Sequence, residues 1–387
     1  MIKKFFVLLL CTLALFSFSG CNKEPDKTEK EETDYLTLEV EELLSRMTRE
    51  EKIAQMIITE IKNDGVLPSP APAGVILFAE NFTTPEETEF LINSLKKQSE
   101  IPLVVSTDQE GGRVQRLSAL KRPKATDIPF MYKLGSTGDT VLAKDVGQVM
   151  ATEMAALGIN LTFAPCLDVY SNPDNTVIGK RSFSEDPRVV SVMANSVADG
   201  LMEKGVMPCF KHFPGHGDTA TDSHYKLPII NKTKEELYKT ELIPFENAIE
   251  KGAEMIMVAH IALPQITGNN NPAPLSKIVI TDLLKNEMGY GGIIITDSFK
   301  MKALTDNYSE EEAVKMAIDA GVDIILMPKD YKTALKVINE NFSDERIDQS
   351  VKKILYFKQK NLLELPDYDL SVIGSAEHKS TIDKINR

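Results

Sequence analysis

The sequence predicts an α/β protein that forms a single TIM-type (β/α)8 barrel, with the catalytic domain only. Three observations lead to this fold class. The chain has 387 residues, which is enough for one large barrel. Short β-branched runs recur eight times along it, and most are separated by segments with helical periodicity. Buried strands that alternate with helices imply a parallel sheet, and eight such units favour closure into a barrel.

Each predicted element has a local sequence pattern that justifies it. A helical pattern begins at Glu41, and Thr48 is placed as an N-cap ahead of Glu51. The predicted strands are short apolar runs, at residues 56–59, 74–78, 103–107, 159–164, 206–213, 255–261, 292–296 and 322–327. The predicted helices carry apolar residues spaced by threes and fours, at residues 85–98, 140–157, 189–204, 234–251, 311–320 and 348–361.

Residues 1–20 have the pattern of a bacterial lipoprotein signal peptide. Two lysines precede a 15-residue uncharged run, which is too short to span a bilayer comfortably. The run ends at residues 18–21 (FSGC), which resemble a lipobox after which Cys21 receives lipid. We therefore expect an extracytoplasmic protein that is lipid-anchored to a bacterial membrane. Residues 21–36 would form a charged tether and 37–365 the barrel, followed by a polar tail at 366–387 that frays.

Charge and cysteine content exclude several classes of function. The composition is ordinary for a globular protein, with 42% hydrophobic and 26% charged residues. The net charge of −13 argues against a nucleic-acid partner, and no basic stripe is present. Cys166 and Cys209 lack any CxxC spacing and are expected to be buried, with a disulfide between them left open. We expect no metal or organic cofactor, and a monomer.

Polar residues follow many of the apolar runs directly. In a parallel barrel these positions form the carboxyl-terminal rim, where catalytic groups gather. The residues concerned are Asp108, Gln109, Glu110, Asp168, Lys211, His212, His260, Asp297 and Ser298.

Residues 211–224 hold three of the five histidines of the chain. His212 and His216 are four apart, as in zinc-binding helices, but the intervening Phe-Pro-Gly cannot continue a helix. The alternative is a loop that presents His224, with Asp222 placed to hold its imidazole. A nearby carboxylate raises the pKa of a histidine toward neutrality, which suits a general acid and base. A solvated surface loop is the plainer interpretation of the same residues.

Three further segments contain candidate site residues. Asp297 ends a buried strand and is a candidate nucleophile, or else the N-cap of a helix that begins near Ser298. Asp108 and Arg116 flank a paired-glycine turn, and such a loop can bind sugar hydroxyls with forked donors and bidentate acceptors. Arg181 adds a cation that could equally belong to a surface ion pair.

These motifs together resemble glycoside hydrolase family 3, in its β-N-acetylglucosaminidase branch. The central match is KHFPGHGDTATDSHYKLP at residues 211–228. It is supported by DQEGGRVQR at 108–116, APCLDV at 164–169, IGKRSFSEDP at 178–187 and ITDSFKM at 295–301. The resemblance implies a retaining barrel glycosidase in which Asp297 is the nucleophile, His224 with Asp222 is the acid and base pair, and the sugar is bound by Asp108, Arg116, Arg181, Lys211 and His212.

The expected function is therefore removal of terminal β-linked N-acetylglucosamine from peptidoglycan or muropeptide fragments, through a covalent glycosyl-enzyme. The same resemblance leaves a β-N-acetylglucosaminide phosphorylase or a β-glucosidase open. A sugar-binding surface lipoprotein and a metal-dependent deacetylase are the alternatives from other classes.

Overall fold

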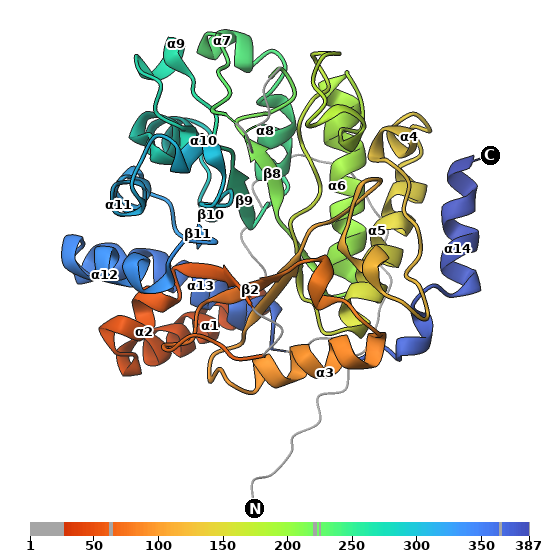
Figure 1. Ribbon diagram of the computed structural model, residues 1–387, viewed down its shortest axis with the longest axis horizontal. Helices are drawn as coiled ribbons and strands as arrows, with labels where there is room; N and C mark the ends of the chain where they lie inside the picture. Colours follow the sequence, from red (N-terminus) through yellow and green to blue (C-terminus); the bar gives the residue numbers. More distant parts are fainter. Residues whose placement is uncertain (1–26, 62–64, 220–222, 224–225, 364–365, 387) are drawn as a thin grey trace, which may run out of the picture.

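The computed structural model describes residues 27–61, 65–219, 223, 226–363 and 366–386, and it describes only the backbone of residues 27–34 and 386. Its centre is a curled parallel sheet that helices surround (Figure 1). Within the described part, no helix is long and apolar enough to cross a membrane.

The parallel strands form two hydrogen-bonded sets. One set has the order β11-β1-β2-β3-β6-β7 and the other β10-β9-β8. Every pair within these sets is parallel, as predicted. The strands are β1 (Ile57–Glu60), β2 (Gly74–Leu77), β3 (Val104–Thr107), β6 (Leu161–Thr162), β7 (Met207–Pro208), β8 (Phe210–Phe213), β9 (Met255–Val258), β10 (Ile293–Thr296) and β11 (Ile325–Leu326).

Each of the eight predicted runs contains a strand, and the run at 206–213 contains two. Strands β7 and β8 follow one another with only Cys209 between them, so the chain passes directly from one set to the other. Parallel bridges also join Cys166 to Lys211 and Ile295 to Ile324. Apart from the exposed Glu60, the residues of these strands are buried, because helices cover the outer face of the sheet.

Most of the predicted helices are present in the structure. Thr48 caps α2 through a reciprocal capping box with Glu51, as predicted. The main helices are α1 (Lys27–Arg46), α2 (Arg49–Ala54), α3 (Pro85–Lys96), α5 (Thr140–Ala156), α6 (Pro187–Glu203), α7 (Lys234–Leu237), α8 (Ile243–Glu250), α11 (Glu310–Ala320), α12 (Tyr331–Asn341) and α13 (Asp344–Asn361). The single helix predicted over 234–251 is wrong, because α7 ends at Leu237 and a new helix, α8, begins at Ile243. Pro244 lies in the first turn of α8, where a proline is tolerated.

The remaining elements are short and lie mostly between strands and helices. Two strands, β4 (Gln109–Gly111) and β5 (Val114–Gln115), form an antiparallel hairpin that was not predicted. The short helices are η1 (Ala79–Asn81), η2 (Arg116–Ala119), α4 (Met131–Gly135), η3 (Gly179–Arg181), α9 (Pro264–Thr267), η4 (Ala273–Leu275), the π-helix η5 (Ile278–Glu287), α10 (Lys302–Thr305), η6 (Leu370–Val372), α14 (Ala376–Asp383) and η7 (Lys384–Asn386).

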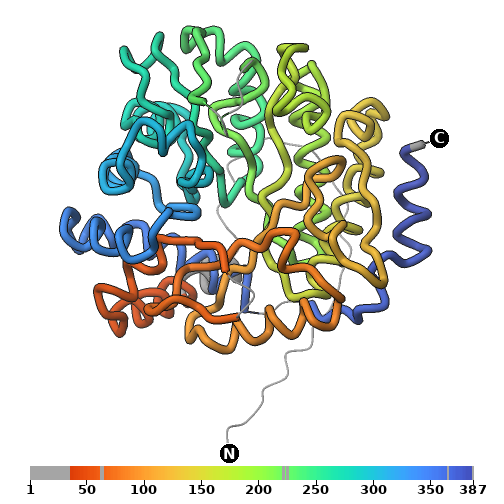
Figure 2. Tube along the Cα trace, viewed as in Figure 1, coloured from red at the N-terminus to blue at the C-terminus, as the bar shows by residue number. Residues whose placement is uncertain are grey.

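The two chain ends differ from the prediction. The expected boundary between tether and barrel at residue 36 falls inside a helix, since α1 begins at Lys27 and packs on α13. The tail from residue 366 does not fray. Helix α14 packs on α5 at the edge of the molecule (Figure 2), and Ile373 and Ile382 are buried. The buried carboxylate of Glu153 accepts the Gly374 N–H at 2.9 Å, which ties the tail to α5.

Cys166 and Cys209 form no disulfide with each other. Cys166 and Cys209 are both buried and both free. Burial raises the pKa of each thiol, so both remain protonated near neutral pH.

Candidate active site

The β4–β5 hairpin brings acidic and basic side chains to the carboxyl edge of the sheet. Asp108 lies between β3 and β4, Glu110 lies in β4, and Arg116 follows β5. The turn uses Gly111 and Gly112 with φ angles of 108° and 57°, which L side chains rarely adopt. The paired glycines noted in the sequence are therefore needed for the hairpin that positions these three side chains.

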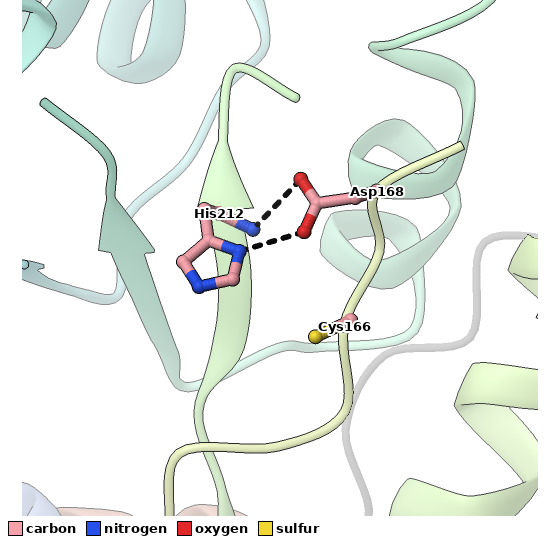
Figure 3. Close-up of side chains that lie close together, drawn as sticks. All are labelled: Cys166, Asp168 and His212. Carbon is pink, nitrogen blue, oxygen red and sulfur yellow. Dashed lines mark hydrogen bonds and ion pairs between the residues drawn. The ribbon is translucent and has the colours of Figure 1, made fainter. Parts of the chain in front are cut away.

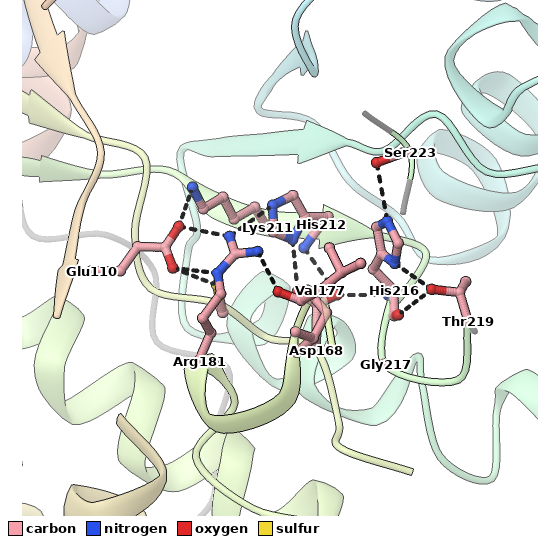
Figure 4. A network of polar contacts seen from close by, with 12 residues as sticks. Glu110, Asp168, Val177, Arg181, Lys211, His212, His216, Gly217, Thr219 and Ser223 are labelled. Atoms are coloured by element: carbon pink, nitrogen blue, oxygen red, sulfur yellow. Dashed lines mark hydrogen bonds and ion pairs between the residues drawn. The ribbon is translucent and has the colours of Figure 1, made fainter. Parts of the chain in front are cut away.

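Four of the five predicted sugar-binding residues are linked with Glu110 in one charged cluster. Lys211 donates from Nζ to Asp108 Oδ1 at 2.8 Å. Its Nζ also lies 2.6 Å from Glu110 Oε1 (Figure 4). Arg181 forms a bidentate pair with Glu110, at 2.7 Å from Nε and 2.8 Å from Nη2. Arg116 Nη2 lies 3.3 Å from Asp108 Oδ2, and its guanidinium stacks over Phe78. The alternative interpretation of Arg181, a surface ion pair, is wrong, since its pair with Glu110 is buried.

Mutual charge stabilisation keeps this cluster ionised despite its burial. Burial alone would raise the pKa of the Glu110 carboxyl, but Arg181 and Lys211 hold it far below its ordinary value. Burial alone would lower the pKa of the Lys211 ammonium, but Asp108 and Glu110 raise it above its ordinary value. The cluster therefore presents fixed cations and carboxylates at one edge of the sheet.

His212, the fifth predicted sugar-binding residue, is oriented by Asp168. Its Nδ1 lies 2.6 Å from Asp168 Oδ2, and its backbone N–H donates to Oδ1 at 3.3 Å (Figure 3). On its other side, His212 Nε2 lies 3.4 Å from Arg181 Nη2. Burial would raise the pKa of the Asp168 carboxyl, but His212 and the backbone N–H of His216 hold it below its ordinary value. The buried carboxylate thus fixes the ring next to the charged cluster.

The zinc-helix interpretation of His212 and His216 does not fit the structure. His212 lies in β8, and the two rings stand edge to face with centroids 6.0 Å apart. Another possible ligand group exists, because atoms of Cys166, Asp168 and His212 lie within 4.8 Å of one another (Figure 3). The Asp168 carboxylate is already hydrogen-bonded, however, and burial and Glu110 raise the pKa of the Cys166 thiol. A metal needs the thiolate, so these groups fit a hydrogen-bonded pair better.

Asp297 lies at the carboxyl end of β10, the strand two places from β8 in the same set. Its Oδ1 accepts the Ser298 N–H at 2.7 Å. Burial would raise the pKa of the carboxyl, but His212, His260, the Ser298 N–H and Lys211 hold it below its ordinary value. The N-cap alternative is wrong, because α10 begins only at Lys302. Asp297 is therefore an ionised carboxylate. Lys211, one of the predicted sugar-binding residues, is among the groups that favour this charge.

Three predicted site residues lie outside the described residues. These are the acid and base pair, Asp222 and His224, and the lipidation site, Cys21. Their roles stay predictions.

Three of the rim residues that the sequence analysis left without a role take part in the site. Glu110 binds both Arg181 and Lys211, Asp168 orients His212, and His260 lies near Asp297, with its Nε2 2.9 Å from the Ser298 carbonyl oxygen. The available signal was their position at or shortly after the end of an apolar run. These hydrogen-bond partners of Glu110, Asp168 and His260 lie 71, 44 and 38 residues away, so sequence spacing could not identify them.

The fold and the site are those of the glycosidase class of α/β enzymes. Carboxylates, cations and imidazoles meet at the carboxyl edge of a curled parallel sheet, and an ionised aspartate stands among them. The N-terminal domain of glycosyl hydrolase family 3 matches residues 48–357, and the chain belongs to this family. The resemblance seen in the five motifs is thereby confirmed.

Individual relatives support the same assignment. Beta-hexosaminidase A of Pseudoalteromonas piscicida is 38% identical over 275 residues, which cover 66% of this chain and 45% of that protein. This chain thus matches less than half the length of that relative. The structure of a family 3 beta-N-acetylglucosaminidase from Paenibacillus sp. str. FPU-7 is 33% identical, with a TM-score of 0.79 over 88% of this chain and 68% of that one. The beta-glucoside phosphorylase BglX is 26% identical, with a TM-score of 0.83 over 91% of this chain and 66% of that one.

Proposed function

We propose that this chain is a retaining exo-β-N-acetylglucosaminidase. Asp297 is the nucleophile, and His224 with Asp222 is the acid and base pair. The observation that carries the proposal is Asp297 itself: it ends a strand at the carboxyl edge, and His212 and His260 favour its ionised form. A glycosidase nucleophile must be an unprotonated carboxylate. The similarity to a β-N-acetylglucosaminidase and to a β-hexosaminidase supports the choice of sugar.

The proposed reaction has two steps, and every proton is accounted for in each. In the first step, a carboxylate oxygen of Asp297 bonds to the anomeric carbon while the bond from that carbon to the leaving oxygen breaks. Protonated His224 gives its proton to that oxygen, and the aglycone leaves as an alcohol. In the second step, neutral His224 takes a proton from water, whose oxygen bonds to the anomeric carbon and releases Asp297. Two inversions retain the configuration.

The charged cluster is the proposed sugar-binding site. Asp108 and Glu110 offer acceptors to hydroxyl groups, while Lys211 and Arg181 offer donors. These cations and carboxylates already hold one another in place, so little side-chain freedom remains to be lost when a sugar binds.

Assays with aryl glycosides test the nucleophile and the acid. Asp297→Asn should reduce release of the aryl alcohol from an aryl N-acetylglucosaminide by at least about a thousandfold, because the covalent intermediate cannot form. Asp306→Asn, an exposed change a few residues later, is the matched control and should keep activity. His224→Ala should spare the most activated leaving groups. Full activity of Asp297→Asn, or an equal loss in His224→Ala on all leaving groups, would refute the assigned roles.

Phosphorolysis is the second candidate function, and the similarity to the beta-glucoside phosphorylase BglX supports it. A histidine acid and base adds no negative charge, so a phosphate could approach the anomeric carbon in place of water. The assay should therefore compare aryl N-acetylglucosaminide with aryl glucoside, each with and without phosphate. A sugar 1-phosphate product would identify a phosphorylase, a preference for the glucoside would identify a β-glucosidase, and binding without turnover would identify a sugar-binding lipoprotein.

Two further parts of the proposal concern location and substrate. The FSGC sequence at residues 18–21 supports lipid attachment at Cys21 on the outer side of a bacterial membrane. That location suits peptidoglycan or muropeptide fragments as substrate. Fatty-acid labelling of the protein should be lost in Cys21→Ser, and labelling that persists in this variant would contradict the anchor.

The finer architecture is also a proposal. The Ile295–Ile324 bridge and the passage from β7 to β8 join the two sets of strands at both ends, and they support closure into the (β/α)8 barrel that the eight runs predict.

A further inference from the structure

A cationic pocket lies next to the proposed sugar-binding site. It has a volume of about 570 Å³ and lies between the β4–β5 turn, η3 and the segment 127–136. Arg113, Lys133 and Lys180 line it, against one carboxylate, that of Asp127, among the described residues of the lining. The whole chain has a net charge of −13, so a pocket in which cations outnumber carboxylates runs against the overall charge. Its three cations lie far apart in the sequence, and the fold brings them together.

The pocket and the charged cluster share a wall. The Val177 carbonyl oxygen accepts Nη1 of Arg181, a member of the cluster, at 3.1 Å (Figure 4). The same oxygen also accepts Nη2 of Arg113, which lines the pocket. In η3, Lys180 directly precedes Arg181, so one short helix supplies a cation to each site. The two sites are therefore neighbours, and the guanidinium groups of Arg113 and Arg181 stand between them.

Hydrogen bonds within the protein hold the wall of the pocket in place. The Gln115 side chain donates from Nε2 to the Gly112 carbonyl oxygen at 2.7 Å and to Asp127 Oδ1 at 3.0 Å. Its Oε1 accepts the Ile128 N–H at 2.9 Å, and the Ile128 carbonyl oxygen accepts the Gly112 N–H at 2.8 Å. A Cβ at Gly112 would lie 2.3 Å from Cδ1 of Phe130, so the ring packs directly on the turn. A pocket that is already formed loses little conformational freedom when a ligand binds.

The lining fits a ligand that carries a carboxylate next to an apolar group. Arginine and lysine bind carboxylates through charge-assisted hydrogen bonds. The rings of Phe130 and Tyr132 are half-buried in the same lining and offer apolar surface beside the cations. Lys133 and Lys180 are exposed, so their ammonium groups can turn toward a ligand.

We infer that this pocket is a second subsite of the enzyme, which takes a carboxylate carried by the leaving part of the substrate. The charged cluster around Glu110 holds the terminal sugar, and the pocket on the other side of Arg113 holds the anionic group. The inference deepens the proposed function and rests on it, since a leaving part exists only if the enzyme cleaves a glycoside. It makes the charge of the leaving part a determinant of specificity.

Paired substrates test the inference in the full chain. Each pair consists of two aryl N-acetylglucosaminides with alanine linked to the aryl ring through an amide bond, one ending in a carboxylate and the other in a carboxamide. One pair carries a single alanine and a second pair carries two, so that two distances from the sugar are sampled. The wild type should show a kcat/KM about three- to tenfold higher for the carboxylate member of at least one pair. The preference should shrink as the salt concentration rises.

Variants assign the preference to the pocket. In Lys133→Gln and in Lys180→Gln, the ratio of kcat/KM for the carboxylate member to that for the carboxamide member should fall toward one. The double variant should lose the preference altogether. Lys97→Gln, which removes an exposed cation at the end of α3, is the matched control and should keep the ratio of the wild type.

The outcomes separate this inference from the proposed function. If the wild type cleaves every substrate but shows no preference for the carboxylate in either pair, the inference alone is wrong. A preference that both Lys133→Gln and Lys180→Gln leave unchanged would also overturn it. If the wild type cleaves none of these substrates and no simple aryl N-acetylglucosaminide, the proposed function is wrong and the inference falls with it.

Discussion

Glu110 stabilises two cations that burial would otherwise make unfavourable. Its carboxylate binds Arg181 with both oxygens and also contacts Lys211. Removing one partner of a buried ion pair leaves an uncompensated charge, which costs far more than losing an exposed pair. Glu110 therefore contributes to stability and to the geometry of the proposed sugar-binding site together.

The substitution Glu110→Gln tests this role. It keeps the size of the side chain but removes its charge, and Lys211 retains Asp108 as a partner. We expect the free energy of unfolding in urea to fall by about 3 kcal/mol. Glu203→Gln breaks the exposed pair with Lys144 and serves as the control, with a much smaller loss expected. Similar losses in the two variants would show that the buried pairs contribute no more than a surface pair.

Single residues of the site were predictable where they directly follow a strand or belong to a motif. Asp108, Lys211, His212 and Asp297 were placed at the rim because each ends an apolar run. Glu110 follows the same apolar run as Asp108, but its role depends on Arg181, which lies 71 residues away. Contacts of that kind are set by the tertiary fold, and no sequence pattern encodes them.

At the scale of the elements, α13 contains a lysine with an unusual environment. Lys358 is 0% exposed, and its Nζ donates to Gln55 Oε1 at 2.7 Å across the interface between α13 and the end of α2. Burial lowers the pKa of Lys358 to about 7. In the unfolded chain a lysine has a pKa of about 10.4, so the folded state disfavours the protonated form.

This lysine predicts that stability rises with pH. Between about pH 7 and pH 10 the unfolded chain binds a proton that the folded chain lacks, so the free energy of unfolding increases with pH. From pH 7 to pH 9 the contribution of Lys358 should grow by about 2 kcal/mol. Urea unfolding should show this increase in the wild type and lose it in Lys358→Met. Lys360→Met, on an exposed site of the same helix, should keep it. An identical pH dependence in wild type and Lys358→Met would refute the assignment.

Helices and strands were predictable where the local sequence pattern determines them. They were not predictable where contacts with residues distant in the sequence determine them. The strands were found because β-branched runs are strong local signals. The region 366–386 has too few apolar residues to predict a packed helix. It is ordered nonetheless, because Gly374 and His378 bind the carboxylate of Glu153, more than 200 residues earlier. The apolar residues over 234–251 keep a helical spacing throughout, so this spacing did not reveal the break before α8. Pro244 lies in the first turn of α8, and its ring cannot continue a preceding helical turn.

At the scale of the whole molecule, the proposed barrel depends on the contact between β10 and the chain before β11. The Thr296 N–H donates to the Ile324 carbonyl oxygen at 3.1 Å, and the Ile324 N–H donates to the Ile294 carbonyl oxygen at 3.1 Å. Strand β11 pairs in turn with β1, and the Ile325 N–H donates to the Met56 carbonyl oxygen at 2.9 Å. These bonds place β10 and β11 inside a continuous series of parallel strands, with no free edge between them.

Hydrogen exchange distinguishes a closed barrel from an open curled sheet. In a closed barrel, the amides of 293–296 and 322–326 open only with the whole domain, so they should exchange as slowly as those of β3, which has a partner on both sides. In an open sheet, β10 and β11 would be edge strands, and local opening would expose their amides first. Peptides that cover 293–296, 322–326 and 104–107 should therefore show similar protection by mass spectrometry, while the exposed segment 121–124 exchanges quickly. Much faster exchange in the first two peptides than in 104–107 would mean that the sheet does not close, and Asp297 would then stand at the edge of the sheet and not on the rim of a barrel.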